Sequence, residues 1–139
     1  MSHGVTLIVK GLRLSLLICV FAGAPLAEAL AQSIAIEVVS AEATHDAQTG
    51  KPVVAYRMSA ASTRAFFDLT KNNIGRKAAV MIDGRVMVEP LILAAMMSPY
   101  SQISGDFDIE EARSIARRLS DGTAKLTIGI ASDGGRGKQ

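Results

Sequence analysis

Short runs of β-branched and other apolar residues recur along the chain and predict strands. These runs cover residues 34–39, 53–58 and 124–130, and residues 102–107 resemble a short strand with a glycine irregularity. Within residues 53–58 successive side chains would alternate between two faces, as a strand requires. Residues 40–50 are polar, contain alanines and lack a clear period, so we expect a loop there.

A β-hairpin is the clearest local prediction. Two apolar runs, residues 79–82 and 85–88, flank the pair Asp83-Gly84. This pair favours a two-residue turn, because both positions accept the positive φ that matches the twist of the strands. The expected cross-strand pairs are Ile82 with Arg85, Met81 with Val86, and Val80 with Met87.

Two segments have the three- and four-residue spacing of amphipathic helices. The first covers residues 60–73, with Ser59 as its N-cap, and the second runs from Asp108 to the vicinity of Gly122. Strands and helices therefore follow one another along one short chain. We expect an α+β fold, a mainly antiparallel sheet with two helices packed on one face.

The first thirty residues predict a signal peptide. Lys10 and Arg13 precede an apolar run, and Ala29-Leu30-Ala31 places small residues three positions and one position before a cleavage site. We expect cleavage after Ala31, which would leave no stable membrane span. The alternative is an uncleaved anchor, which we favour less because the run is short and contains Gly and Pro.

The chain is accordingly divided into four parts. The expected parts are a signal peptide (1–31), an N-terminal strand and loop (32–49), an α+β domain (50–131) and a flexible tail (132–139).

Composition and charge exclude several functional classes. The 15 Lys+Arg and 13 Asp+Glu are scattered and give a net charge of +2, so we expect no nucleic-acid binding. With 49% hydrophobic and 20% charged residues, the chain is too apolar for disorder. The single cysteine, Cys19, lies in the predicted leader, so the processed protein would have no thiol. A cysteine-free product fits the periplasm, where we expect the protein to be located.

Catalytic and metal-binding groups are scarce. His45 is the only histidine after residue 31, and a zinc site needs three or four clustered ligands. A serine nucleophile would need a base, and no Gly-x-Ser-x-Gly motif is present. We therefore expect no enzyme activity, no cofactor and no metal, and we interpret His45-Asp46 as part of a solvent-facing loop. A small hydrolase or metal protein is the least favoured alternative.

Four carboxylates lie close together near the start of the second helix: Asp106, Asp108, Glu110 and Glu111. Their density is compatible with a calcium site or a catalytic pair. Their position at a helix start is explained more simply by capping and by the helix dipole. We favour this structural interpretation.

A segment rich in leucine and methionine is the remaining candidate site. Leu91, Leu93, Met96, Met97 and Tyr100 combine flexible thioethers with an aromatic ring, a composition that can repack against varied apolar partners. We take Leu93, Met96, Met97 and Tyr100 as candidate polypeptide-binding residues. The alternative is that these side chains fill the core.

An ordered set of short motifs resembles the head subdomain of the first periplasmic domain of the SecD/SecDF protein-export family. The motifs lie in residues 50–58, Phe67 and Thr70, residues 73–77, residues 82–86, Pro90, residues 103–107 and residues 110–112. No single motif is diagnostic, because Asp-Gly hairpins and capping boxes are common. The resemblance, which covers residues 50 to about 130, implies a role in protein export.

The chain departs from this family in two respects. Complete members span the membrane repeatedly, and this sequence contains no such set of helices. The family also implies a Gly-rich connection where residues 93–100 read Leu-Ala-Ala-Met-Met-Ser-Pro-Tyr, so the partner of this segment could differ. We expect a non-catalytic module whose partner is a protein, either an exported polypeptide or an export complex. The alternative is an envelope assembly protein that acts by self-association, as a homo-oligomer, or through a fixed protein partner.

Overall fold

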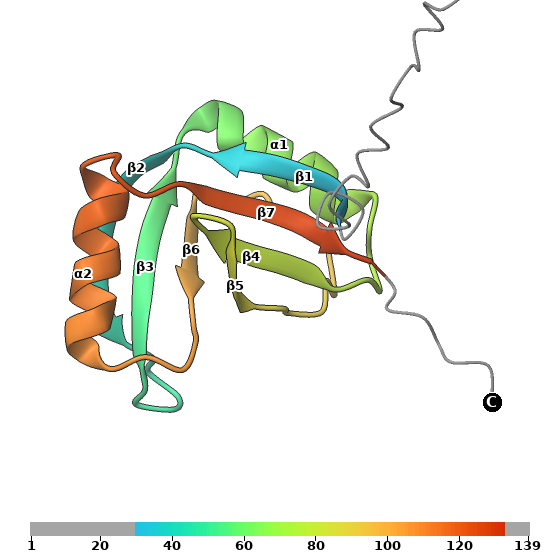
Figure 1. The fold of residues 1–139 in the computed structure, drawn as a ribbon. Coiled ribbons are helices and arrows are strands. Elements are labelled where there is room, and N and C mark those ends of the chain that lie inside the picture. Colours follow the sequence, from blue (N-terminus) through green and yellow to red (C-terminus); the bar gives the residue numbers. More distant parts are fainter. Residues whose placement is uncertain (1–29, 133–139) are drawn as a thin grey trace, which may run out of the picture.

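The computed structural model describes residues 30–132, and within them it contains seven strands and two helices (Figure 1). The predicted signal peptide and tail fall almost entirely on residues 1–29 and 133–139, outside the described residues. In chain order the elements are β1 (Leu30–Ile36), β2 (Val38–His45), β3 (Pro52–Met58), α1 (Ala60–Lys71), β4 (Ala78–Ile82), β5 (Arg85–Val88), β6 (Tyr100–Ile103), α2 (Ile109–Ser120) and β7 (Leu126–Ala131).

The strands form two antiparallel sheets. Sheet A has the order β1-β7-β4-β5, and sheet B has the order β2-β3-β6. The predicted α+β class and antiparallel pairing are confirmed. The prediction of a single sheet is corrected, because the chain passes from one sheet to the other between β1 and β2.

This passage occurs at Glu37, the one residue between β1 and β2. The Glu37 amide donates to Ser62 Oγ (2.9 Å), and the Glu37 carbonyl accepts from the Ser59 amide (3.0 Å). Both serines belong to the first turn of α1 or its cap. One continuous stretch of chain thus serves both sheets, and the start of α1 is fixed at the corner.

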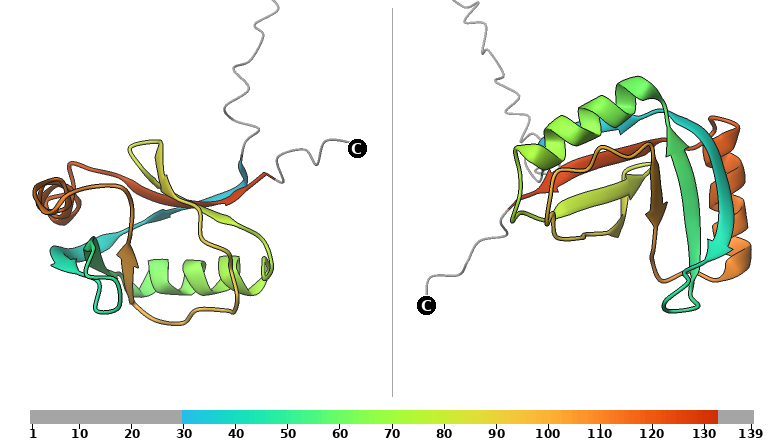
Figure 2. Two further views of the ribbon diagram at one scale, coloured as in Figure 1. Left: turned by 90° about the horizontal axis from the view of Figure 1, so that it is seen from below. Right: turned by 180° about the vertical axis from the view of Figure 1, so that it is seen from behind.

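Each sheet has its own helix, which corrects the expectation that both helices pack on one face of one sheet. Seen from below, α1 lies beneath sheet A. In the same view α2 lies at one end of the molecule, against sheet B (Figure 2). α2 contacts β2 and β3. The inward faces of both sheets and both helices share one core, which includes Ile36, Val54, Tyr56, Met58, Phe66, Leu69, Val80, Ile92, Ile103, Phe107, Ile115, Leu119, Leu126, Ile128 and Ile130.

The predicted helices and hairpin are confirmed, with one difference in register. Ser59 caps α1, and Asp83 and Gly84 have φ values of 51° and 81°, as a primed turn requires. Two predicted pairs are present, Ile82 with Arg85 and Met81 with Val86. The third differs, since a bulge places Val80 opposite Val88.

Two strand predictions need correction. Residues 40–45, predicted as loop, continue β2, and this strand pairs with β3 along its length. The strand predicted at residues 102–107 is shorter and earlier, at Tyr100–Ile103. Within residues 30–132 no helix has the length and apolar character needed to cross a bilayer.

Candidate functional site

Residues 91–100, which we call the apolar segment, connect β5 to β6 and are fixed along their length by main-chain hydrogen bonds. The segment lacks regular secondary structure until β6 begins at Tyr100. It is nevertheless held in place at both ends and in the middle. The bonds run from the Ala78 amide to Pro90 O (2.9 Å), the Ile92 amide to Arg76 O (2.8 Å), the Gly75 amide to Ile92 O (2.8 Å), the Met96 amide to Thr70 Oγ1 (3.0 Å) and the Met58 amide to Pro99 O (2.7 Å).

The candidate binding side chains are exposed. Leu93 is 79% exposed, Tyr100 67%, Met97 58% and Met96 43%; Leu91 is exposed as well. In the apolar segment, Ile92 is the buried residue and belongs to the core. The interpretation that these residues fill the core is therefore wrong for all five apolar residues singled out from the sequence. Several large apolar side chains exposed together often mark an interaction site.

A cleft of about 450 Å³ opens beside the apolar segment, a volume within the range of ligand-binding pockets. Leu93 and Met96 line this cleft, whereas Met97 and Tyr100 do not. Its other walls come from α1, sheet A and the β6 edge. The residues contributed by these elements include Phe66, Thr70, Val80, Val88, Ile128, Ser101 and Gln102.

Thr70 connects the floor of the cleft to the apolar segment. Its buried hydroxyl donates to Phe66 O (2.9 Å) in the preceding turn of α1 and accepts from the Met96 amide (3.0 Å). Both hydrogen-bonding functions of the hydroxyl are thus used inside the core. Sequence reasoning treated Thr70 only as part of a helix face and a family motif. Its spacing from Phe66 placed it on the inner face, but nothing local indicated Met96 as its partner.

At each outer edge of sheet B, a serine hydroxyl bonds the main chain of one residue in the same way. At β6, Ser98 Oγ accepts from the Tyr100 amide (3.1 Å) and donates to the Tyr100 carbonyl (3.2 Å). At β2, Ser120 Oγ of α2 accepts from the Ala41 amide (3.0 Å) and donates to the Ala41 carbonyl (3.1 Å). Each hydroxyl takes the place that a neighbouring strand would fill.

The carboxylates before α2 have structural roles. Asp108 caps the helix by accepting from the Glu111 amide (2.8 Å), and Glu110 pairs with Arg113. This arrangement supports the capping interpretation. Among residues 30–132 no group of three or more His, Cys, Asp or Glu side chains could hold a metal ion.

Asp46 organises the turn between β2 and β3. Its carboxylate accepts from the Thr49 and Gln48 amides (2.8 and 2.9 Å) and from the Gln102 side chain (3.1 Å) of β6. These hydrogen bonds, the Thr49 amide foremost, lower the pKa of Asp46 to about 2. His45 is exposed at the end of β2.

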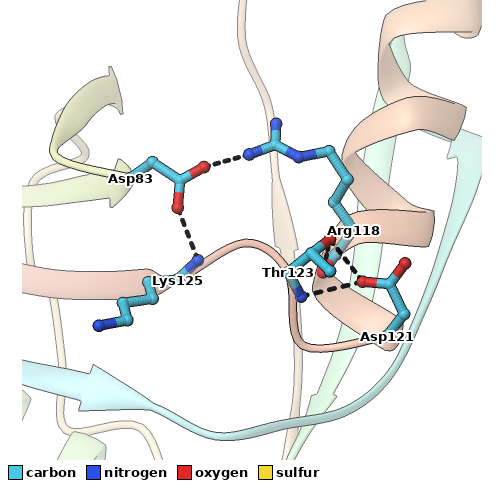
Figure 3. Close-up of polar contacts among 5 residues, drawn as sticks. All are labelled: Asp83, Arg118, Asp121, Thr123 and Lys125. Carbon is cyan, nitrogen blue, oxygen red and sulfur yellow. Dashed lines mark hydrogen bonds and ion pairs between the residues drawn. The ribbon is translucent and has the colours of Figure 1, made fainter.

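A polar network joins the β4–β5 turn to the end of α2 (Figure 3). The Asp83 carboxylate accepts from the Lys125 amide (2.9 Å) and pairs with Arg118, and these contacts lower its pKa. Hydrogen bonds from Thr123 lower the pKa of Asp121 in the same network. The network fixes sheet A beside α2, which suits a structural role.

Comparison with known proteins agrees with the geometry. The family described as "SecDF, P1 head subdomain" matches residues 30–125. The protein translocase subunit SecD of Acetobacter pasteurianus is 30% identical over 94 residues, and the SecDF subunit of Thermus thermophilus is 32% identical over 95 residues. Each match covers 68% of this chain, but only 18% and 13% of those proteins.

Solved structures give the same result. A structure of SecDF described as a membrane component that enhances protein export superposes with a TM-score of 0.58 at 32% identity, over 69% of this chain and 43% of that one. The crystal structure of SecDF in a super-membrane-facing form gives a TM-score of 0.57 at 33% identity, over 60% of this chain and 11% of that one.

Proposed function

Because the chain belongs to the SecDF P1 head subdomain family, we propose that it is a non-catalytic protein-binding module of protein export that acts in the periplasm after its leader is removed. Its partner would be an exported polypeptide or the periplasmic part of an export complex. The chain spans less than a fifth of the two translocase subunits described above, so this proposal concerns one module and not their whole activity.

The observation that carries this proposal is the exposure of the apolar segment. Its leucine and methionine side chains lie in water although hydrogen bonds hold their backbone in place. Methionine side chains are flexible and polarisable, so they adapt to apolar partners of different shape. A segment of unfolded chain exposes such varied apolar groups. The backbone of the site would stay fixed while its side chains repack.

Binding to an unfolded protein tests the proposal. Tagged protein, expressed from the full coding sequence, is titrated with fluorescently labelled lactalbumin that has been reduced and carboxymethylated. We expect binding, and we expect Met96→Ser combined with Met97→Ser to weaken it by about tenfold, because two thioethers that the bound chain would cover are removed.

A matched control separates the site from general stickiness. Val39 and Val86 are 45% and 47% exposed on strands β2 and β5, and neither lines the cleft. Their joint replacement by serine should leave the affinity unchanged. The proposal fails if folded protein, verified by circular dichroism, does not bind the unfolded chain or if both double variants bind as well as the wild type.

Self-association is the second candidate, because an exposed apolar segment can also pack against its own copy. A photo-crosslinking amino acid at position 97 distinguishes the two in cells. Crosslinks to exported precursors or export membrane proteins support the first function. Crosslinks only to the protein itself, together with a stable oligomer in light scattering, support the second.

A further inference from the structure

We propose that the open edge of β6 accepts an extended polypeptide as an additional strand of sheet B, with the apolar side chains of that strand entering the neighbouring cleft. This inference rests on the proposed function and specifies how the polypeptide would be held. Its ligand class is an extended chain in which apolar and polar residues alternate.

The main-chain direction of β6 can be followed from its hydrogen bonds. Pro99 accepts from the Met58 amide of β3, and Ser101 lies opposite Tyr56 of the same strand. Main-chain groups of a strand alternate between its two sides. The amides and carbonyls of Tyr100 and Gln102 therefore point away from β3, toward the open edge.

Ser98 already occupies the position of a partner strand on this edge. Its hydroxyl bonds both the amide and the carbonyl of Tyr100, at 3.1 and 3.2 Å. A residue of an added strand would make the same two contacts. The hydroxyl satisfies Tyr100 in the free protein, and because Ser98 is only half-buried, rotation of its side chain would release Tyr100 without moving the anchored backbone.

The cleft lies where the side chains of an added strand would point. Gln102 and Ser101 line it from the β6 side, and Leu93 and Met96 line it from the apolar segment. In a paired strand every second side chain lies on the same face of the sheet. Every second residue of the bound chain would thus meet the apolar walls, which allows many different sequences to bind.

The opposite edge of sheet B is not equivalent. β2 is packed against α2, and Ser120, which blocks its Ala41, is part of that helix. An incoming strand would have to displace a helix there. At β6 it would displace only a serine side chain. The proposal is therefore specific to the β6 edge.

Backbone-methylated peptides test this mode of binding. The probe is a short labelled peptide in which leucine and threonine alternate, measured by fluorescence anisotropy with the full-length protein. Two further peptides carry N-methyl groups on all leucine amides or on all threonine amides. Only one of these two sets can face β6, so we expect one series to lose about tenfold in affinity and the other to bind like the parent.

A variant of the protein supplies a second measurement. Ser98→Ala releases the amide and carbonyl of Tyr100 and should tighten parent-peptide binding by about two- to tenfold. Equal affinities of the two methylated series, or unchanged or weaker binding by Ser98→Ala, overturn the proposal. If Met96→Ser with Met97→Ser still weakens binding in that case, the proposed function stands and only the strand-addition mode fails. Absence of binding by any peptide or unfolded protein overturns both.

Discussion

Gly105 is the residue at which the chain after β6 has least room. A Cβ atom built there would lie 2.7 Å from Cε1 of Phe107, closer than carbon atoms approach in proteins. The Phe107 ring is buried in the shared core and cannot move freely. A side chain at this position would therefore force the Phe107 ring to shift within the core.

We expect Gly105→Ala to lower the free energy of unfolding by about 1–3 kcal/mol, because the added methyl group overpacks a buried ring. Urea denaturation followed by circular dichroism measures this change. Ser104→Ala, at the exposed neighbouring position, should differ from the wild type by less than about 0.5 kcal/mol. An unaffected Gly105→Ala variant would show that Phe107 can relax.

At the level of residues, the binding role of the apolar segment stays a prediction, whereas its place at the surface is now established. Leu93, Met96, Met97 and Tyr100 were identified from their chemistry, and their exposure agrees with that choice. Exposure itself could not be predicted, because the same residues would also suit a core. It follows from distant bonds such as the one between Met96 and Thr70.

Among the elements, the edge strand β2 depends on a side chain from a distant part of the chain. β2 exposes Glu42 and Thr44, and its outer edge is covered by α2 and Ser120. Such an edge needs a cover, since unpaired main-chain groups invite pairing with other chains. Ser120 provides this cover with a small side chain, whose hydroxyl bonds both main-chain groups of Ala41.

Ser120→Ala should lower the free energy of unfolding by about 0.5–1 kcal/mol, since water replaces part of the two lost hydrogen bonds at this exposed site. Amide hydrogen exchange at Ala41 should become faster. Ser114→Ala on the same helix is the matched control and should leave the Ala41 exchange rate unchanged. Equal exchange in wild type and Ser120→Ala would contradict the covering role.

Elements with a strong local signal were predicted well. Helix caps and the Asp-Gly turn depend on neighbours in sequence, and Ser59, Asp108 and Asp83 are placed as expected. β2 was missed because its core-facing residues at this end, Ala41 and Ala43, are small and give only a weak alternating apolar signal. The division into two sheets was missed because the corner at Glu37 has no Gly or Pro, and is fixed by α1.

For the molecule as a whole, two aspartates connect elements that are far apart in sequence, and a third holds a local turn. Asp46 joins the β2–β3 turn to β6, and Asp83 joins sheet A to the chain after α2, while Asp121 shapes that connection. Hydrogen bonds to their carboxylates lower the pKa of each. The folded state therefore binds protons less readily at these sites than the unfolded chain.

Stability should accordingly depend on acid pH. A lowered carboxyl pKa stabilises the fold above the unfolded value, near 3.8, and this contribution disappears as the pH falls through the folded value, about 2 for Asp46. We expect constant stability from neutral pH to about 4 and a decline below it. Denaturation with urea at several pH values measures this, and Asp46→Asn should show a shallower decline. An identical profile for that variant would contradict the assignment.

The first pair of the sheet A ladder joins Leu30 of β1 to Ala131 of β7, the two ends of the folded unit. The first and last residues of the folded unit therefore lie side by side, separated by the distance between two paired strands. A unit with this geometry can be carried within a surface loop of a larger protein without forcing that loop apart.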